Sequence, residues 1–491
     1  MKTVVNFLLL ISLFFSSFLP AQNIYHDTYQ FHSIFSSHEA AIEATPEGGF
    51  IFVNNIELDY STNSSLFEIP FIIGKKAADG TTLWLEQYDP FPDSDVAFYP
   101  ISIKYSPIDQ TFVHAGYLFL PDGTQQIYLQ KIDDSGMQIW FNTYDCAIGG
   151  DDASIKIFCG SWEFTAIDIN SEGIIAGIGS ISEQFGSSGL FVFYVHEDGS
   201  FGKAKLFGSD DIDFPKNGVM IKHYETDFFV LGESRHFNPN NEYIQPIVMR
   251  IDAQMNVIWR KIYSDLTTAS HLFTMETQDM VITGGGICII QGIRNREFYS
   301  DLNEIYLIAI GPNGNHLWDN TFSINTPTGD SGFLRTYMAI DFQDQVYIGF
   351  NQRLAFNNHG NLNYELNPGL IKTNAGGTPQ WYKTMIGSAW DLHAEGIAIV
   401  EGDNQFMIGM IGQANSQQHS VAGELWLSSF SGNTGENDCI GEDKSLISKN
   451  IEYFSLDYLL EEKEVSMDRE EQGIDYHTPT YTPKRCGFVL Y

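Results

Sequence analysis

The sequence contains few cysteines and few basic residues, and each scarcity excludes a class of protein. Five cysteines in 491 residues are too few for a disulfide framework. Lysine and arginine together number 26 against 62 aspartates and glutamates, which gives a net charge of −36. Because nucleic acids and anionic membrane surfaces are held by lysine and arginine, this balance argues against both as partners. The same balance is compatible with cationic ligands and divalent ions as partners.

Long apolar runs are also lacking after residue 21. Residues 1–21, MKTVVNFLLLISLFFSSFLPA, combine one lysine, an apolar run over 7–15 and a small residue at the end, which is typical of a signal peptide. The alternative is a membrane anchor, but three serines interrupt the run and it is short for a span. We therefore expect cleavage before Gln22 and an exported chain, secreted or on the cell surface, without a transmembrane span.

A repeat of about 55 to 60 residues dominates the rest of the sequence. One half-unit carries a turn followed by Trp and an aromatic residue: KKAADGTTLWLEQY (75–88), QKIDDSGMQIWFNTY (130–144), MRIDAQMNVIWRKIY (249–263), AIGPNGNHLWDNTF (309–322) and KTNAGGTPQWYKTM (372–385). A sixth copy, FYVHEDGSFGKAKLF (193–207), keeps the turn and lacks the Trp. The other half-unit is two apolar runs around a polar or glycine turn, found over 40–55, 101–116, 164–179, 219–234, 273–286, 337–350 and 396–410.

Each half-unit reads as a β-hairpin, so one complete unit supplies four antiparallel strands, as in a propeller blade. The sequence predicts an all-β fold: a seven-bladed β-propeller of four-stranded antiparallel blades over residues 22–431. The last unit lacks its fourth strand, and the segment NIYHDTY (23–29) resembles the missing one. Since a ring without open edges resists aggregation, we expect this N-terminal strand to close the last blade.

The recurring residues have a structural explanation first. A glycine stands four residues before the Trp in four copies, where a hairpin turn needs a positive φ angle. Met255 takes that place in one copy and predicts a different turn there. We expect the tryptophans to pack between neighbouring blades; the alternative is that they stack on a ligand.

The repeat resembles the secreted repeat propellers abundant in Bacteroidota, many of which are cargo of the type IX secretion system. The resemblance covers residues 23–431 and implies surface delivery. The glycine-to-Trp spacing is also similar to the tryptophan-docking motif of quinoprotein propellers, which we interpret as shared blade packing.

Residues 432–491 lie outside the repeat and form a short C-terminal appendage. The stretch LDYLLEEKEVSMDREEQG (456–473) is acidic and predicts a short helix. Two disulfides are compatible with export, Cys146 with Cys159 and Cys439 with Cys486, the second of which would staple this tail. Cys288 lies in an apolar run and is expected to be a buried small side chain.

Candidate binding residues lie in the loops that cross from one blade to the next, where loops of a propeller converge. These loops are acidic, and their carboxylates suit Ca²⁺; aspartate is equally a favoured turn residue. The candidates are Asp93, Asp95, Asp151, Asp152, Asp210, Asp211, Asp213, Asp265, Asp330 and Asp391. Three histidines near the starts of inner strands would suit a transition metal if they converged, namely His38, His271 and His393.

Two functions follow from the sequence. The first is a non-catalytic secreted or surface propeller that binds an extracellular protein or glycan. The second is an extracellular hydrolase or lyase with Asp and His at the channel mouth as acid and base. No nucleophile elbow, HExxH or P-loop motif occurs in the sequence.

Overall fold

The computed structural model describes residues 26–29, 40–55, 71–89, 96–149, 156–158, 161–182, 188–208, 214–238, 241–265, 273–296, 303–324, 332–358, 361–384, 390–401, 406–416, 424–431, 446–449, 453–457, 461–471, 475–477 and 484–485. Within these ranges every regular element is a β-strand, so the all-β prediction is confirmed. The same ranges hold no helix that is long and apolar enough to cross a membrane.

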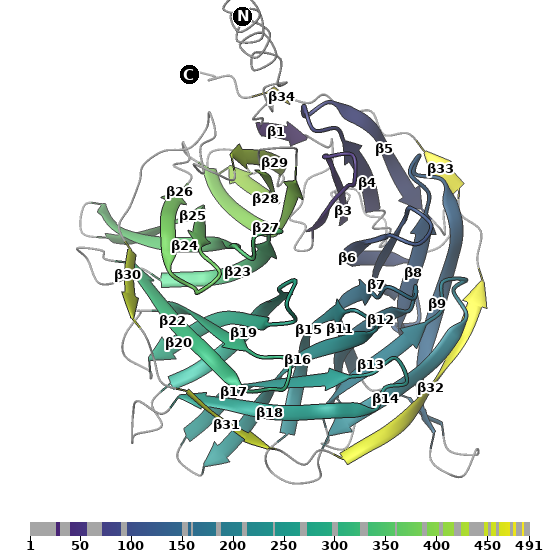
Figure 1. Cartoon of the computed structure of the whole chain (residues 1–491). Coiled ribbons are helices and arrows are strands. Elements are labelled where there is room, and N and C mark those ends of the chain that lie inside the picture. Colours follow the sequence, from purple (N-terminus) through teal and green to yellow (C-terminus); the bar gives the residue numbers. More distant parts are fainter. Residues whose placement is uncertain are drawn as a thin grey trace, which may run out of the picture.

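The strands form meanders of four consecutive antiparallel strands, and the meanders are arranged as a ring (Figure 1). Four sheets contain one meander each from consecutive strands: β2 Ala40–Ala44, β3 Phe50–Asn55, β4 Phe71–Lys76 and β5 Thr82–Asp89; β15 Phe214–Tyr224, β16 Asp227–Asn238, β17 Asn241–Ile251 and β18 Val257–Asp265; β19 Phe273–Ile282, β20 Cys288–Arg296, β21 Asn303–Ile310 and β22 His316–Ile324; and β23 Gly332–Ile340, β24 Val346–Asn358, β25 Asn361–Thr373 and β26 Pro379–Thr384.

A fifth sheet closes the ring. It contains β27 Trp390–Glu401, β28 Phe406–Ser416 and β29 Glu424–Ser431, and its fourth strand is β1, His26–Tyr29. The register places Tyr29 opposite Leu425 and His26 opposite Ser428. The N-terminal strand therefore completes the last meander, as expected from its likeness to the fourth strands.

The sixth sheet corrects the predicted number of blades. Its ten strands include two meanders: β6 Ala97–Ser106, β7 Thr111–Phe119, β8 Gln125–Ile132 and β9 Gln138–Gly149; and β11 Ser161–Ile169, β12 Ile175–Ser182, β13 Ser188–Val195 and β14 Phe201–Gly208. Strand β32, Glu461–Glu471, pairs with β14 through residues 461–465 and with β9 through residues 466–471. One long-range strand thus joins both outer edges, and the propeller has six blades rather than seven when a blade is counted as one continuous sheet.

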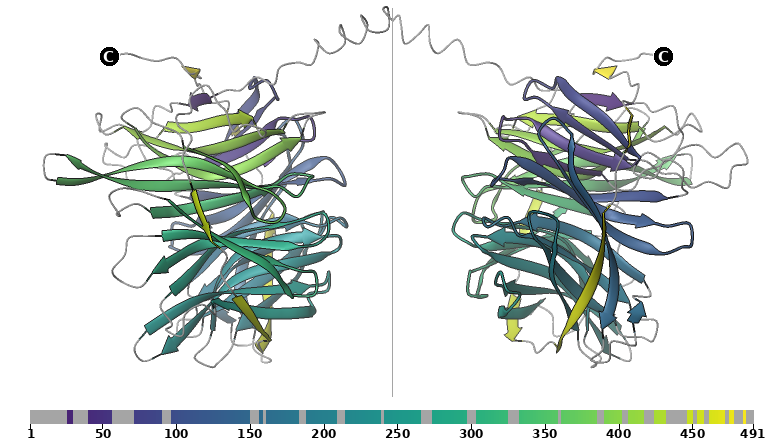
Figure 2. Two further views of the ribbon diagram at one scale, coloured as in Figure 1. Left: turned by 60° about the vertical axis from the view of Figure 1, so that its left-hand side comes forward. Right: turned by 90° about the vertical axis from the view of Figure 1, so that its right-hand side faces the viewer.

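The C-terminal segment runs along the outside of the ring (Figures 1 and 2, yellow strands). Besides β32, four short strands of this segment each pair with the outermost strand of a meander. They are β30 Leu446–Lys449 with β22, β31 Tyr453–Asp457 with β18, β33 Asp475–His477 with β5, and β34 Lys484–Arg485 with β1. The prediction of a short helix within residues 456–473 is wrong, because residues 461–471 form a strand. An open sheet edge offers unpaired backbone groups to any extended segment, and this explains why the charged sequence is extended here.

The tryptophans pack between neighbouring meanders, as predicted. Trp259 donates a hydrogen bond from Nε1 to the carbonyl of Pro312, 2.7 Å away, in the next hairpin. Its ring lies over Gly314, where an added Cβ would be 2.9 Å from the ring. Trp84 and Trp140 repeat the arrangement, with hydrogen bonds to the carbonyls of Asp134 and Glu197 at 3.0 and 3.1 Å.

The turn at Met255 corrects another expectation. Met255 has a φ of 61°, close to the values of the glycines in the same position. The turn also closes in the same way, with Met255 N donating to Asp252 O at 2.9 Å. The preceding hairpin has Lys203 where the other copies carry Trp, so no indole ring covers this turn. The Met255 side chain is fully buried in its place, beside Tyr194, whose hydroxyl donates to Asp252 O at 2.9 Å.

Hydrophobic cores lie between neighbouring meanders. One cluster, for example, joins Leu129 and Tyr144 of one meander with Ile167 and Phe193 of the next. Cys288 is fully buried with a free thiol, as expected for a small core side chain, and burial raises its pKa above the ordinary value.

Candidate functional site

The first strand of each meander lies at the axis of the ring, and side chains from the preceding meander hold its free edge. Glu233 Oε1 accepts a hydrogen bond from Thr277 N at 2.8 Å, and Asp279 Oδ2 accepts one from Met338 N at 2.6 Å. Asn351 Oδ1 accepts one from Ala394 N, also at 2.6 Å. Because an edge strand otherwise leaves these N–H groups without protein partners, the polar side chains of the inner and second strands have a structural role as well.

A cavity of about 520 Å³ lies near the starts of four inner strands, β11, β15, β19 and β23. These starts follow the crossovers from the preceding meanders, so the cavity lies on the crossover side of the ring. We call it the crossover cavity. Its lining residues are Glu163, Thr165, Asn217, Gly218, Val219, Glu233, Ile244, Glu276, Thr277, Gln278, Arg335, Thr336 and Tyr337.

Glu233 lies on the inner wall of this cavity. Its side chain is only 4% exposed, and its carboxylate accepts hydrogen bonds from Thr277 N at 2.8 Å and Asn217 Nδ2 at 3.3 Å. Thr277 is in turn reached by the hydroxyl of Tyr306, whose Oη lies 3.3 Å from its Oγ1. The carboxylate is therefore fixed by the neighbouring strands, a condition for a group that is to orient a ligand.

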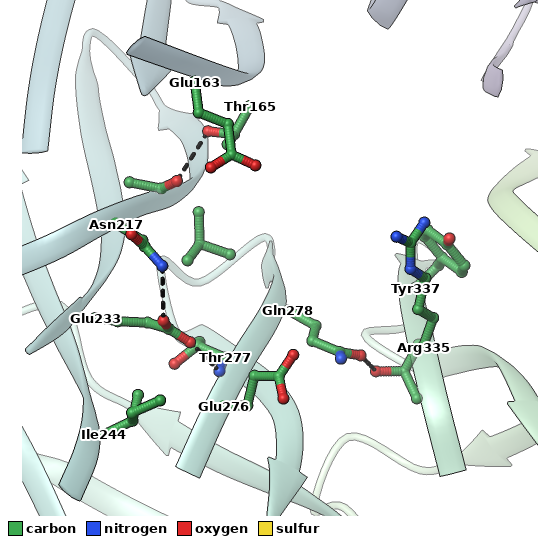
Figure 3. A pocket seen from close by; sticks show the side chains of 13 residues that line it. Glu163, Thr165, Asn217, Glu233, Ile244, Glu276, Thr277, Gln278, Arg335 and Tyr337 are labelled. Carbon is green, nitrogen blue, oxygen red and sulfur yellow. Dashed lines mark hydrogen bonds between the residues drawn. The ribbon is translucent and has the colours of Figure 1, made fainter. Parts of the chain in front are cut away.

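Glu163, Glu276 and Arg335 are the charged side chains of the cavity that are exposed to solvent. Figure 3 shows Glu163 and Glu276 facing a common space, with Arg335 and Tyr337 on its other side. The two glutamates occupy the same place in the repeat, because each pairs with the residue after a glycine of the second strand, Ser180 or Ile293. Carboxylates from two meanders thus meet a guanidinium and a phenol from a third.

Tyr337 is held in its protonated form. Burial raises its pKa above the ordinary value, and the nearby Glu395 carboxylate raises it further, whereas a hydrogen bond with Arg335 acts in the opposite direction. The phenol can therefore donate a hydrogen bond at neutral pH. Beside it, Thr336 Oγ1 donates to Gln278 Oε1, and Gln278 Nε2 donates to Leu334 O at 3.2 Å.

The arrangement combines acceptors and donors around one solvent-reached space. Glu163 and Glu276 supply acceptors, Arg335 and Tyr337 supply donors, and Val219 and Ile244 are the aliphatic side chains of the lining. Such a lining suits a ligand with several hydroxyl or amide groups rather than a lipid. In the described ranges no group of three or more His, Cys, Asp or Glu side chains is placed to hold a metal ion.

The residues predicted from the sequence lie elsewhere. Asp93, Asp95, Asp151, Asp152, Asp210, Asp211, Asp213, Asp330, His38 and His271 are outside the described residues, as are Cys159, Cys439 and Cys486. Asp265, Asp391, His393 and Cys146 lie in strands whose backbone alone is described at those positions. Their proposed roles in binding ligands, Ca²⁺ or transition metals, and in disulfides, stay predictions.

The sequence interpretation concentrated on crossover loops and missed the glutamates inside the strands. A signal was present in the repeat. Aligned on the glycine of the second strand, Glu163, Asn217 and Glu276 fall at one position of three successive repeats. Polar residues at a shared inner-strand position indicate a common polar surface at the axis, which loop composition does not reveal.

No protein-family model and no curated protein sequence matches the chain. Solved structures with a similar fold include a sialidase of Trypanosoma rangeli (10% identity, TM-score 0.38, covering 81% of this chain and 54% of that one) and an α-L-arabinofuranosidase of Fusarium graminearum (10% identity, TM-score 0.42, covering 84% and 98%). A sialidase of Streptococcus pneumoniae is another (11% identity, TM-score 0.35, covering 87% and 70%). This chain therefore spans about half the length of the Trypanosoma enzyme. At these identities and TM-scores, the likeness says nothing about the chemistry of this chain.

Proposed function

We propose that the chain is an exported propeller that binds a glycan in the crossover cavity. The observation that supports it is the convergence of polar side chains from successive meanders, Glu163, Glu276 and Arg335 among them, on one cavity of about 520 Å³. A volume of this size accommodates a few sugar rings. Sugar hydroxyls both donate and accept hydrogen bonds, so they match a lining that offers carboxylate acceptors beside phenol and guanidinium donors.

The charge of the molecule favours this ligand class over other polymers. The net charge of −36 repels nucleic acids. Within the cavity three carboxylates, those of Glu163, Glu233 and Glu276, face one guanidinium. Neutral and amino sugars therefore fit the lining better than strongly acidic glycans. The N-terminal signal-peptide pattern agrees with an encounter outside the cell.

Binding of a glycan panel to the mature chain, measured by isothermal titration calorimetry, tests the proposal. Glu276→Gln removes the charge of one acceptor at nearly constant shape, and we expect at least about a tenfold loss of affinity for the best neutral sugar. The matched control is Glu172→Gln, because Glu172 is an exposed glutamate in the turn after β11 and outside the cavity lining. Unchanged affinity in Glu276→Gln, or no binding by any neutral or amino sugar, would contradict the proposal.

A second candidate is glycoside hydrolysis by Glu163 and Glu276, favoured by the fact that two solvent-exposed carboxylates border the same space (Figure 3). Glycosidases commonly use such a pair, one carboxyl as acid and the other as base or nucleophile. A reducing-end assay on bound oligosaccharides separates the two functions. Hydrolysis that is lost in Glu163→Gln and in Glu276→Gln supports catalysis, whereas binding without turnover leaves a binding protein.

A further inference from the structure

A second cavity, of about 430 Å³, lies near the opposite ends of the inner strands and is lined by residues from all of them. We call it the turn-side cavity. The inner strands β2, β6, β11 and β15 place Glu43, Lys104, Asp168 and Lys222 around it in alternating charge. The strands β19, β23 and β27 line the rest of its wall chiefly with apolar side chains, among them Val281, Met338, Ile340, Ile397 and Ile399. One half of the lining is therefore charged and the other half is apolar.

Most charges in the polar half are already paired. Lys104 Nζ lies 2.5 Å from Glu43 Oε2. Asp168 Oδ2 lies 2.8 Å from His223 Nδ1 and also accepts a hydrogen bond from His223 N at 2.6 Å. Both carboxylates thus have a hydrogen-bonded cationic partner of their own.

Lys222 is different. In the described part of the chain, its ammonium group makes no hydrogen bond or ion pair, although its charge is near enough to lower the pKa of Asp168. Glu225, the remaining carboxylate of the lining, lies exposed at the edge of the turn between β15 and β16. Asp168 and the buried Asp279 attract the Lys222 charge without a hydrogen bond, so its half-buried ammonium group keeps its donors for an anion in the cavity, beside the apolar wall.

We propose that the turn-side cavity binds an amphiphilic organic anion, whose carboxylate pairs with Lys222 and whose apolar body packs on Met338, Ile340, Ile397 and Ile399. The carboxylate of the ligand forms an ion pair that is partly shielded from water, and its apolar body buries the apolar side chains of the cavity wall. This site is independent of the crossover cavity, because the two cavities have no lining residue in common.

Calorimetric titration of the whole mature chain with hexanoate tests the proposal, with acetate and hexan-1-ol as the two incomplete ligands. We expect hexanoate to bind at least about tenfold more tightly than either, because only hexanoate offers both the charge and the apolar chain. Lys222→Met keeps the length of the side chain and removes its charge, and it should reduce hexanoate affinity about tenfold while leaving hexan-1-ol unaffected. Lys203→Met, on the outer strand β14, is the matched control and should bind like the wild type.

Ala398→Trp provides a second variant, because Ala398 lines the apolar half and a larger side chain would occupy it. It should weaken hexanoate and hexan-1-ol alike. Far-ultraviolet circular dichroism and the unfolding midpoint establish that each variant is folded. Hexanoate binding that survives in Lys222→Met, equal binding of acetate and hexanoate, or no hexanoate binding by the folded wild type would each overturn the proposal.

Discussion

The indole of Trp259 covers Gly314 so closely that a Cβ at that glycine would lie 2.9 Å from the ring. Gly314 also has a φ of 76°, which side chains with a Cβ rarely adopt. The contact joins two neighbouring meanders, and Trp84 with Gly136, Trp140 with Gly199 and Trp318 with Gly377 repeat it. Glycine is therefore favoured at each of these positions for two reasons: the backbone has a positive φ angle, and the indole leaves no room for a Cβ.

Gly314→Ala should separate these requirements when it is compared with Gly123→Ala. Gly123 has a φ of 84° but no atom within 4 Å of its added Cβ. Its substitution should cost about 1 kcal/mol from the backbone alone. Gly314→Ala should cost a further 1–3 kcal/mol, roughly, because the methyl group must displace the indole. Urea unfolding of both variants measures the difference; equal losses would show that the ring contact adds nothing.

Lys203 and Met255 should be coupled. Lys203→Trp alone should destabilise, because the new indole meets the buried Met255 side chain where other copies have glycine. Met255→Gly opens that space and removes a positive φ on a residue with a Cβ. A double-mutant cycle should therefore give a favourable interaction energy of about 1–2 kcal/mol. Additive effects would mean that residues 203 and 255 do not contact each other as the Trp and glycine of the other repeats do.

His114 should make the fold sensitive to acid. Its fully buried ring donates from Nε2 to Gln130 Oε1 at 2.5 Å, and burial lowers its pKa from 6.5 to about 4. Between these values the unfolded chain binds a proton that the folded chain does not, so stability falls as the pH falls from 6.5 to 4. The loss should be about 3 kcal/mol at most.

His114→Gln removes the titrating group and is the variant to compare. Its unfolding free energy should vary less over this pH range than that of the wild type, whatever its absolute stability. Parallel pH profiles of the two proteins would contradict the assignment.

The Asp168–His223 pair should stabilise the fold at low pH and lose this effect as the pH rises, which is opposite to the effect of His114. The Asp168 carboxylate raises the pKa of His223, so the stabilisation is complete below about pH 6.5 and is lost as the pH rises through the folded-state pKa. Asp168→Asn removes the charge and should destabilise by about 1–3 kcal/mol, because a buried acceptor of two hydrogen bonds is altered. Its deficit relative to the wild type should be larger at pH 6 than at pH 8. A deficit that grows with pH would refute this account.

The sequence predicted the local structure well, because each repeat contains its own evidence. The glycine-to-Trp spacing located the hairpins and the packing between meanders, and the strand over His26–Tyr29 was recognised from its likeness to other fourth strands. Such features depend on neighbours in sequence or on the period itself. The prediction for Met255 was wrong because its side chain disfavours a positive φ, which burial against the preceding meander nevertheless stabilises.

Long-range pairing was beyond the sequence. Residues 461–471, EEKEVSMDREE, are mostly charged and contain only Val465 and Met467 as apolar residues, so nothing in that segment indicates that it bridges β9 and β14. The crossover cavity depends on register in the same way. Glu163 and Glu276 are more than a hundred residues apart, and only the ring places them around one space. The acidic loops were predicted as the binding site because their composition can be read from the sequence, whereas the meeting of distant side chains in space cannot.

Hydrogen–deuterium exchange with the best-binding neutral oligosaccharide tests glycan binding in the crossover cavity most directly. The sugar should slow exchange in the first halves of β11, β15, β19 and β23, around Glu163, Asn217, Glu276 and Arg335. Exchange in the turns at the other end of these strands should stay unchanged. Protection confined to the outer strands or to those turns, with none around the crossover cavity, would contradict the account.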